Sequence, residues 1–150
     1  MTISKAIRYL LVEDSQDHAE LVSSILREAD ARNSIVHVTD GEQALAYLRK
    51  QPPYADDSVP LPDLILLDLK MPRLNGMDTL EHIKADDMLK HIPVVVVSTS
   101  RTDQEVARCH ELGASSFIAK PVRFDELADK IRGLNRYWSS TPEIPKLQGR

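Results

Sequence analysis

The chain has 150 residues, of which 42% are hydrophobic and 28% charged, and its formal net charge is −4. This composition is typical of a folded globular protein, and the length suits one domain with a sizeable core. The acidic balance argues against a nucleic-acid-binding domain, which usually has a basic surface. No apolar run approaches the length of a membrane span, and the single Cys109 fits a reducing compartment. We therefore expect a cytoplasmic protein with no membrane and no nucleic-acid partner.

The first third of the chain predicts two strand–helix pairs. Apolar runs at 7–12 and 35–38 indicate strands, and the spacing of apolar residues over 17–29 is that of a helix. The second helix is expected to begin at Asp40, whose side chain can cap it while Gln43 completes a capping box three residues on.

A proline-rich loop separates these pairs from the rest of the chain. Residues 51–62 contain four prolines, which exclude a helix and a central strand. The run at 64–67 is continuously apolar, as in a parallel strand that is buried on both faces. Asn75 can then cap a third helix.

The remaining elements follow the same alternation. Residues 92–97 form a second continuous apolar run, and 117–119 suggest a short last strand. Thr102 opens a capping box for a helix that Gly113 can terminate, and 122–137 has the apolar stripe of a final helix.

Five strands that alternate with five helices predict an α/β fold. We expect a doubly wound five-stranded parallel sheet covered by helices on both faces. The domain is expected to occupy residues 1–138, followed by an irregular tail at 139–150, which leaves no room for an output domain.

Polar side chains stand where the predicted strands end. Glu13 and Asp14 follow the first strand and Asp68 the third, Ser98 ends the fourth, and Lys120 follows the fifth. Ligands of open parallel sheets bind beyond these ends, so the side chains should converge. Three carboxylates with room for water suit Mg²⁺, and together with a hydroxyl and a lysine they indicate phosphoryl transfer, for which an aspartate can be the nucleophile.

Several motifs, in this order, resemble the receiver domain of two-component response regulators. They are Leu-Val-Glu-Asp-Ser at 11–15, Leu-Leu-Asp-Leu-Lys-Met-Pro at 66–72, Gly76, Pro-Val-Val-Val-Val-Ser-Thr at 93–99, Gly-Ala at 113–114 and Lys-Pro at 120–121. The resemblance covers about residues 6–137 and implies a flavodoxin-like (βα)5 receiver fold. The loop at 51–62 and the ending Tyr137-Trp138 also resemble the small single-domain regulators of cyanobacterial and bacterial phytochromes.

The resemblance implies a role for each strand-end residue. Asp68 would accept a phosphoryl group from a sensor histidine kinase, with a bacteriophytochrome as the preferred partner. Asp14 would bind Mg²⁺ directly, Glu13 through water and Lys70 through its backbone carbonyl, and Asp68 itself would be a further metal ligand. Lys120 would pair with the acceptor and then with the phosphoryl group, and the family predicts a cis Lys120–Pro121 bond.

The resemblance also implies how the signal leaves the domain. Ser98 holds the switch hydroxyl position, Thr99 beside it joins the catalytic residues, and Phe117 is the aromatic switch residue. The output would be binding of a downstream protein or a histidine phosphotransfer protein, and the last helix would support a homodimer.

Simpler roles are open for the same residues. Asp68 could cap a strand end, Glu13 and Asp14 could cap the first helix, and Lys120 could be a surface lysine. Ser98 could be a buried hydroxyl that bonds to the backbone, and Phe117 could be plain core. The five histidines contain no i, i+4 pair, so no zinc site is expected.

Two other functions compete with the phosphorylated switch. Phosphatases of the haloacid-dehalogenase type also use an aspartate at a strand end, but they place a second aspartate two residues on, where this chain has Lys70. A turnover enzyme is therefore not expected. A receiver that only binds partners would not be labelled by a small phosphodonor in the presence of Mg²⁺.

Overall fold

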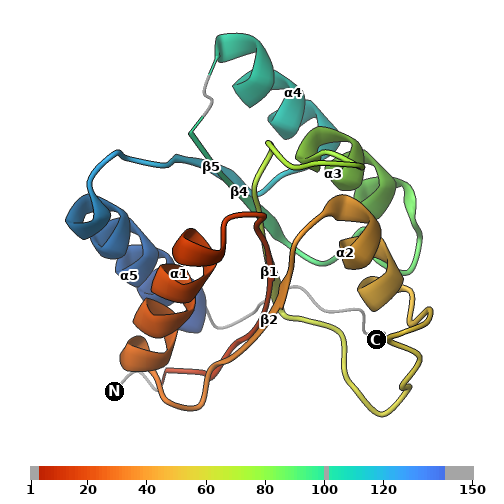
Figure 1. Ribbon diagram of the computed structural model, residues 1–150, viewed down its shortest axis with the longest axis horizontal. Coiled ribbons are helices and arrows are strands. Elements are labelled where there is room, and N and C mark those ends of the chain that lie inside the picture. Colours follow the sequence, from red (N-terminus) through yellow and green to blue (C-terminus); the bar gives the residue numbers. More distant parts are fainter. Residues whose placement is uncertain (1–3, 100–101, 141–150) are drawn as a thin grey trace.

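Five parallel strands form one sheet in the order β2-β1-β3-β4-β5. Figure 1 shows the sheet between two groups of helices. The computed structural model describes residues 4–99 and 102–140. The strands are β1 (Arg8–Val12), β2 (Ser34–Val38), β3 (Leu64–Leu67), β4 (Val94–Ser98) and β5 (Ser116–Ala119), and the helices are α1 (Gln16–Ala29), α2 (Gly41–Leu48), α3 (Gly76–Ala85), α4 (Asp103–Leu112) and α5 (Phe124–Ser140). This order confirms the predicted doubly wound α/β fold of the flavodoxin-like type.

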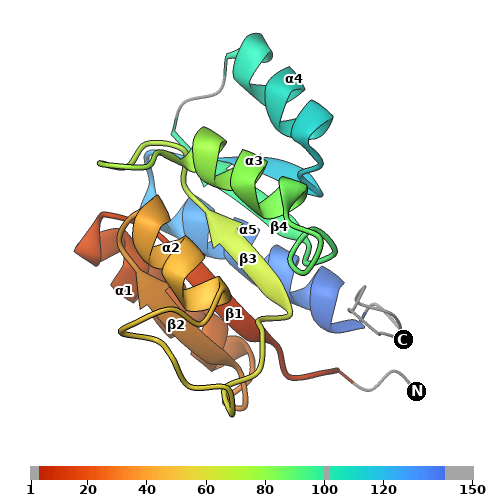
Figure 2. The same cartoon turned by 90° about the vertical axis from the view of Figure 1, so that its right-hand side faces the viewer.

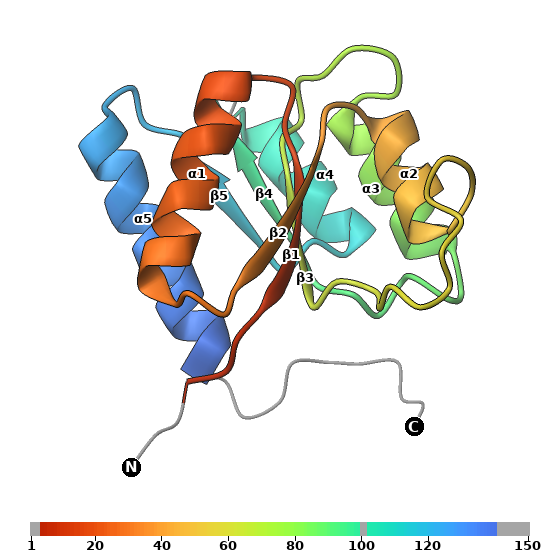
Figure 3. The same ribbon diagram turned by 60° about the horizontal axis from the view of Figure 1, so that its bottom comes forward.

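Helices cover both faces of the sheet. Helices α1 and α5 lie together on one face, while α2, α3 and α4 lie on the other (Figure 3), with α2 and α3 side by side (Figure 2). Along β3, Leu64 and Leu66 pack in the core under α1 and α5, whereas Ile65 and Leu67 pack in the core under the other helices. Because successive side chains of a strand point to opposite faces, a sheet buried on both sides needs continuous apolar runs.

The predicted helix caps are present. The side chains of Asp40, Asn75 and Thr102 each accept a hydrogen bond from a backbone N–H three residues on, and Thr102 forms a complete capping box with Glu105. Gly113 ends α4 with φ of 104°, in the left-handed region. At α2 the box is displaced by one residue, because the side-chain oxygen of Gln43 accepts from the N–H of Thr39 rather than from that of Asp40.

The last helix differs from the prediction at both ends. It begins at Phe124 rather than at residue 122, and it continues to Ser140, so residues 139 and 140 are helical rather than part of an irregular tail. Ser139 is buried, and its backbone carbonyl accepts a hydrogen bond from the N–H of Lys5. The N-terminal segment therefore contacts the part of α5 that extends beyond the predicted end of the helix. The rest of the predicted tail, 141–150, lies outside the described residues.

No helix in the described part of the chain is both long and apolar enough to cross a membrane.

Candidate functional site

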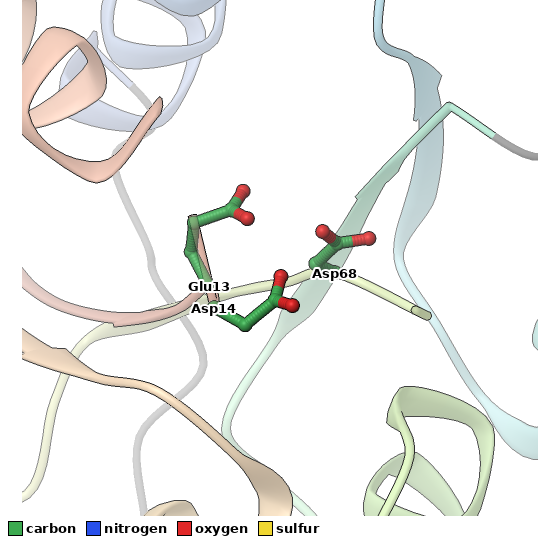
Figure 4. A group of neighbouring side chains, drawn as sticks. All are labelled: Glu13, Asp14 and Asp68. Carbon is green, nitrogen blue, oxygen red and sulfur yellow. The ribbon is translucent and has the colours of Figure 1, made fainter. Parts of the chain in front are cut away.

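Three carboxylates meet at the carboxyl edge of the sheet, between the neighbouring strands β1 and β3. The N–H of Glu13 donates to the carbonyl of Val38, and the N–H of Asp68 donates to that of Val12, so both residues prolong the hydrogen-bond ladders of the sheet. Ligand oxygens of Glu13, Asp14 and Asp68 lie within 4.8 Å of one another, and Figure 4 shows the first two side chains directed toward Asp68. The strand order reverses at this point, where folds of this type bind ligands.

Lys120 brings a positive charge to these carboxylates. Its N–H donates to the carbonyl of Ser98, which fixes its backbone at the end of β5. Its Nζ lies 2.6 Å from Oε1 of Glu13 and 3.3 Å from Oδ2 of Asp68. All three side chains are at least nine-tenths buried, so solvent screens these two ion pairs little.

The predicted cis Lys120–Pro121 bond is wrong. The cis peptide bond in the described residues joins Pro52 to Pro53, and the Lys120–Pro121 bond is trans. The Lys120 side chain nevertheless points into the site, because the two buried carboxylates attract its ammonium group.

Burial changes the acidity of Glu13. Loss of solvent, reinforced by the charge of Asp68, raises the pKa of Glu13 to about 7, although the hydrogen bond from Lys120 acts in the opposite direction. One lysine therefore does not fully compensate the carboxylates. Three carboxylates with hard oxygen donors and a shortage of positive charge fit a divalent cation such as Mg²⁺ or Mn²⁺.

The segment after β3 places Lys70 directly beside Asp68. The N–H of Lys70 donates to Oδ1 of Asp68 at 3.2 Å, and its side chain is exposed. Gly76 begins α3 so close to this segment that a Cβ there would lie 2.1 Å from the carbonyl oxygen of Asp68. The glycine of the sequence motif is therefore required by close packing of α3 on the Asp68 backbone.

An ion pair between an exposed arginine and a buried carboxylate anchors the same segment to α2. Nη1 of Arg73 lies 2.8 Å from Oδ2 of Asp40, whose side chain is almost fully buried. The N–H of Gly41 donates to the carbonyl of Leu74. The sequence indicated only a capping role for Asp40, because the partner is 33 residues away and lies in a loop.

The predicted switch residues lie on the two strands at the other side of Asp68. Ser98 ends β4 and is fully buried, whereas Thr99 just beyond it is exposed. Phe117 on β5 is half-buried and packs against the core under α2, α3 and α4. The register pairs Ser98 with Ala119, two residues beyond Phe117 on the same face of β5.

Two histidines at the site were not predicted. Nδ1 of His18 lies 3.1 Å from Nζ of Lys120, and Nε2 of His37 donates to the carbonyl of Glu13 at 2.7 Å. In the sequence, the lack of two histidines four residues apart argued only against a zinc site. His18 lies in the first turn of α1, and no pattern in the sequence marked it as a neighbour of Lys120, which is 102 residues away.

Comparison with known proteins places this geometry in a family. The response regulator receiver domain model matches residues 9–132. Response regulator Rcp1 of Synechocystis sp. is 35% identical over 136 residues, which are 91% of each chain.

Two solved structures are similar over nearly the whole chain. The phosphorylated cyanobacterial phytochrome response regulator RcpA has a TM-score of 0.89 and 35% identity, covering 95% of this chain and 100% of that one. The Mn²⁺-bound form of response regulator Rcp1 has a TM-score of 0.87 and 34% identity, covering 93% of this chain and 99% of that one. The chain therefore belongs to the response regulator receiver domain family, and its relatives include phytochrome response regulators.

Proposed function

We propose that this chain is a phosphorylation-controlled binding protein that accepts a phosphoryl group on Asp68 from the phosphohistidine of a sensor histidine kinase. One observation carries the proposal. The carboxylate of Asp68 is buried at a strand end with Lys120 at 3.3 Å and the carboxylates of Glu13 and Asp14 beside it. Such a group of charges suits phosphoryl transfer, in which positioning and charge neutralisation supply most of the catalysis.

The transfer is a displacement at phosphorus. A carboxylate oxygen of Asp68 attacks, the new O–P bond forms, the N–P bond of the phosphohistidine breaks, and the imidazole leaves. Lys120 binds the transferred phosphoryl oxygens. Asp14 directly, Glu13 through water and Lys70 through its carbonyl would hold Mg²⁺, which supplies further positive charge when bound.

Phosphorylation would act as a switch. The phosphoryl group adds roughly two negative charges. Ser98, with Thr99 beside it, donates a hydrogen bond to the group, and the side chain of Phe117 turns toward the space that Ser98 leaves. The face formed by α4, β5 and α5 then changes its affinity for a partner.

The proposed output is the binding of another protein through the face formed by α4, β5 and α5. The partner is a downstream protein or a histidine phosphotransfer protein in the cytoplasm, and not a nucleic acid. Similarity to Rcp1 and RcpA supports a phytochrome kinase, a bacteriophytochrome included, as the phosphoryl donor.

The last helix would also support a homodimer. A groove of about 530 Å³ lies between β5 and α5, and Ile118, Leu134 and Trp138 contribute apolar walls. Since β5 is the edge strand next to this groove, a second copy of the chain has both an apolar surface and a sheet edge to contact.

A small phosphodonor tests the function without the kinase. Intact-mass spectrometry should show one phosphoryl group per chain after incubation with phosphoramidate and Mg²⁺, and none when EDTA replaces Mg²⁺ or in Asp68→Asn. An unlabelled wild-type chain would indicate a receiver that only binds partners. Continuous release of phosphate over many equivalents of donor would indicate a turnover enzyme instead.

A further inference from the structure

The ammonium group of Lys120 has three neighbouring acceptors in this structure. They are Oε1 of Glu13 at 2.6 Å, Oδ2 of Asp68 at 3.3 Å and Nδ1 of His18 at 3.1 Å. A lysine ammonium has three N–H donors, so these contacts use its whole donor capacity. Two acceptors belong to the acidic cluster, whereas the third comes from α1.

The contact fixes the protonation of the His18 ring. Lysine donates only, so Nδ1 must be the acceptor and the ring proton of the neutral imidazole lies on Nε2. Burial and the charge of Lys120 lower the pKa of His18, which favours this neutral ring.

Two further contacts position His18, one through its backbone and one through its ring. The backbone N–H of His18 donates to the capping hydroxyl of Ser15, which fixes the first turn of α1. The ring lies edge-on to Phe124 at the start of α5, with centroids 6.1 Å apart and planes at 88°. His18 is thus supported from both helices that cover this face of the sheet.

We propose that His18 is a positioning residue for the phosphoryl transfer described above. Its Nδ1 takes the third N–H of Lys120 and thereby fixes the ammonium group between Glu13 and Asp68. Of the three acceptors, His18 alone is not a carboxyl group. It can therefore hold the ammonium group in place without adding a further negative charge beside the incoming phosphoryl group. This inference rests on the proposed function of Asp68.

Three substitutions separate this role from simple packing. Asparagine places an amide oxygen near the position of Nδ1, glutamine places it nearer that of Nε2, and leucine has no acceptor. With phosphoramidate and saturating Mg²⁺, His18→Leu and His18→Gln should be labelled about three- to tenfold more slowly than wild type, which corresponds to one lost hydrogen bond. His18→Asn should stay within about twofold of wild type.

A second measurement identifies Lys120 as the route of the effect. In a Lys120→Met background, His18→Leu should cause no further loss of rate, because the two changes remove the same interaction. Equal rates for wild type and His18→Leu, equal rates for the Asn and Leu variants, or additive losses in the double variant would each overturn the proposal.

NMR tests the contact without phosphorylation. The ¹⁵Nζ ammonium signal of Lys120 should be protected from solvent exchange in wild type and His18→Asn, and should broaden or disappear in His18→Leu. If the wild-type chain is not labelled by phosphoramidate yet shows this pattern, the proposed function fails while the positioning contact stands. An unprotected wild-type ammonium group would refute the contact itself.

Discussion

Lys120 binds Glu13 more closely than it binds Asp68, the proposed phosphoryl acceptor. Its Nζ is 2.6 Å from Glu13 and 3.3 Å from Asp68. A phosphoryl group on Asp68 would therefore draw the lysine away from Glu13. Together with Asp14, one ammonium group faces three carboxylates, so the ionised cluster carries two uncompensated negative charges.

This excess charge predicts that Asp14→Asn stabilises the metal-free chain. Asp14 has the exposed carboxylate of the cluster, and removing its repulsion should raise the free energy of unfolding by about 1–2 kcal/mol in EDTA. Urea unfolding measures the change. Asp17→Asn is the matched control, because Asp17 is an exposed acid in the first turn of α1 and should show no such gain. A destabilised Asp14→Asn variant would contradict the electrostatic description of the site.

Adding Mg²⁺ should make the wild-type chain more stable than Asp14→Asn, which reverses their order in EDTA. A cation that binds only the folded wild-type chain adds about 2.7 kcal/mol at a concentration of one hundred times its dissociation constant. Asp14→Asn should gain much less under the same conditions, since it lacks a proposed ligand. Thermal unfolding with and without Mg²⁺ provides the comparison, and equal gains in both proteins would exclude Asp14 as a ligand.

Substitution by alanine should have opposite effects on stability at two glycines, Gly76 and Gly133. Gly76→Ala would bring a Cβ to 2.1 Å from the Asp68 carbonyl oxygen and should cost about 1–3 kcal/mol of stability and slow labelling of Asp68. Gly133→Ala, inside α5 with no atom within 4 Å of the new Cβ, should gain about 0.5–1 kcal/mol and leave labelling unchanged. Chemical denaturation and labelling rates measure both, and a harmless Gly76→Ala would refute close packing of α3 on the Asp68 segment.

The neutral ring of His18 predicts a pH dependence of stability. Because the pKa of His18 is lowered in the folded state, the unfolded chain binds the proton more tightly near the ordinary histidine pKa of about 6.5. The neutral ring of His18 therefore makes its full contribution to the free energy of unfolding above that pH. This contribution is lost as the pH falls through the lower pKa of His18 in the folded chain. The midpoint of urea unfolding can be measured at about pH 7.5, 6.5 and 5.5, on both sides of the ordinary histidine pKa. Between the highest and the lowest pH, the midpoint should fall more for wild type than for His18→Asn. Equal decreases of the midpoint in the two proteins would show that the pKa of His18 is not lowered in the folded chain.

The fold could be predicted because its signals are local. Continuous apolar runs such as 64–67, and caps such as Thr102 and Gly113, depend on residues close in sequence. The strand-end residues, from Glu13 to Lys120, could be grouped because the geometry of a parallel sheet brings all such ends to one edge.

The parts that could not be predicted depend on tertiary packing. His18 and Lys120 are 102 residues apart, and their contact requires the particular placement of α1 against the end of β5. The extension of α5 to Ser140 is accompanied by a hydrogen bond from the N-terminal segment, donated by the N–H of Lys5 to the carbonyl of Ser139. The sequence around each of these residues has no pattern that signals the distant partner.

The site of phosphorylation tests the account most directly. Borohydride reduces an aspartyl phosphate to homoserine, so phosphodonor-treated chain can be reduced, digested and sequenced by tandem mass spectrometry. We predict homoserine at position 68 in wild type and at no acidic position in Asp68→Asn. Homoserine at position 14 or at another carboxyl group, or none in a chain that has gained the mass of a phosphoryl group, would contradict the assignment of Asp68 as the acceptor.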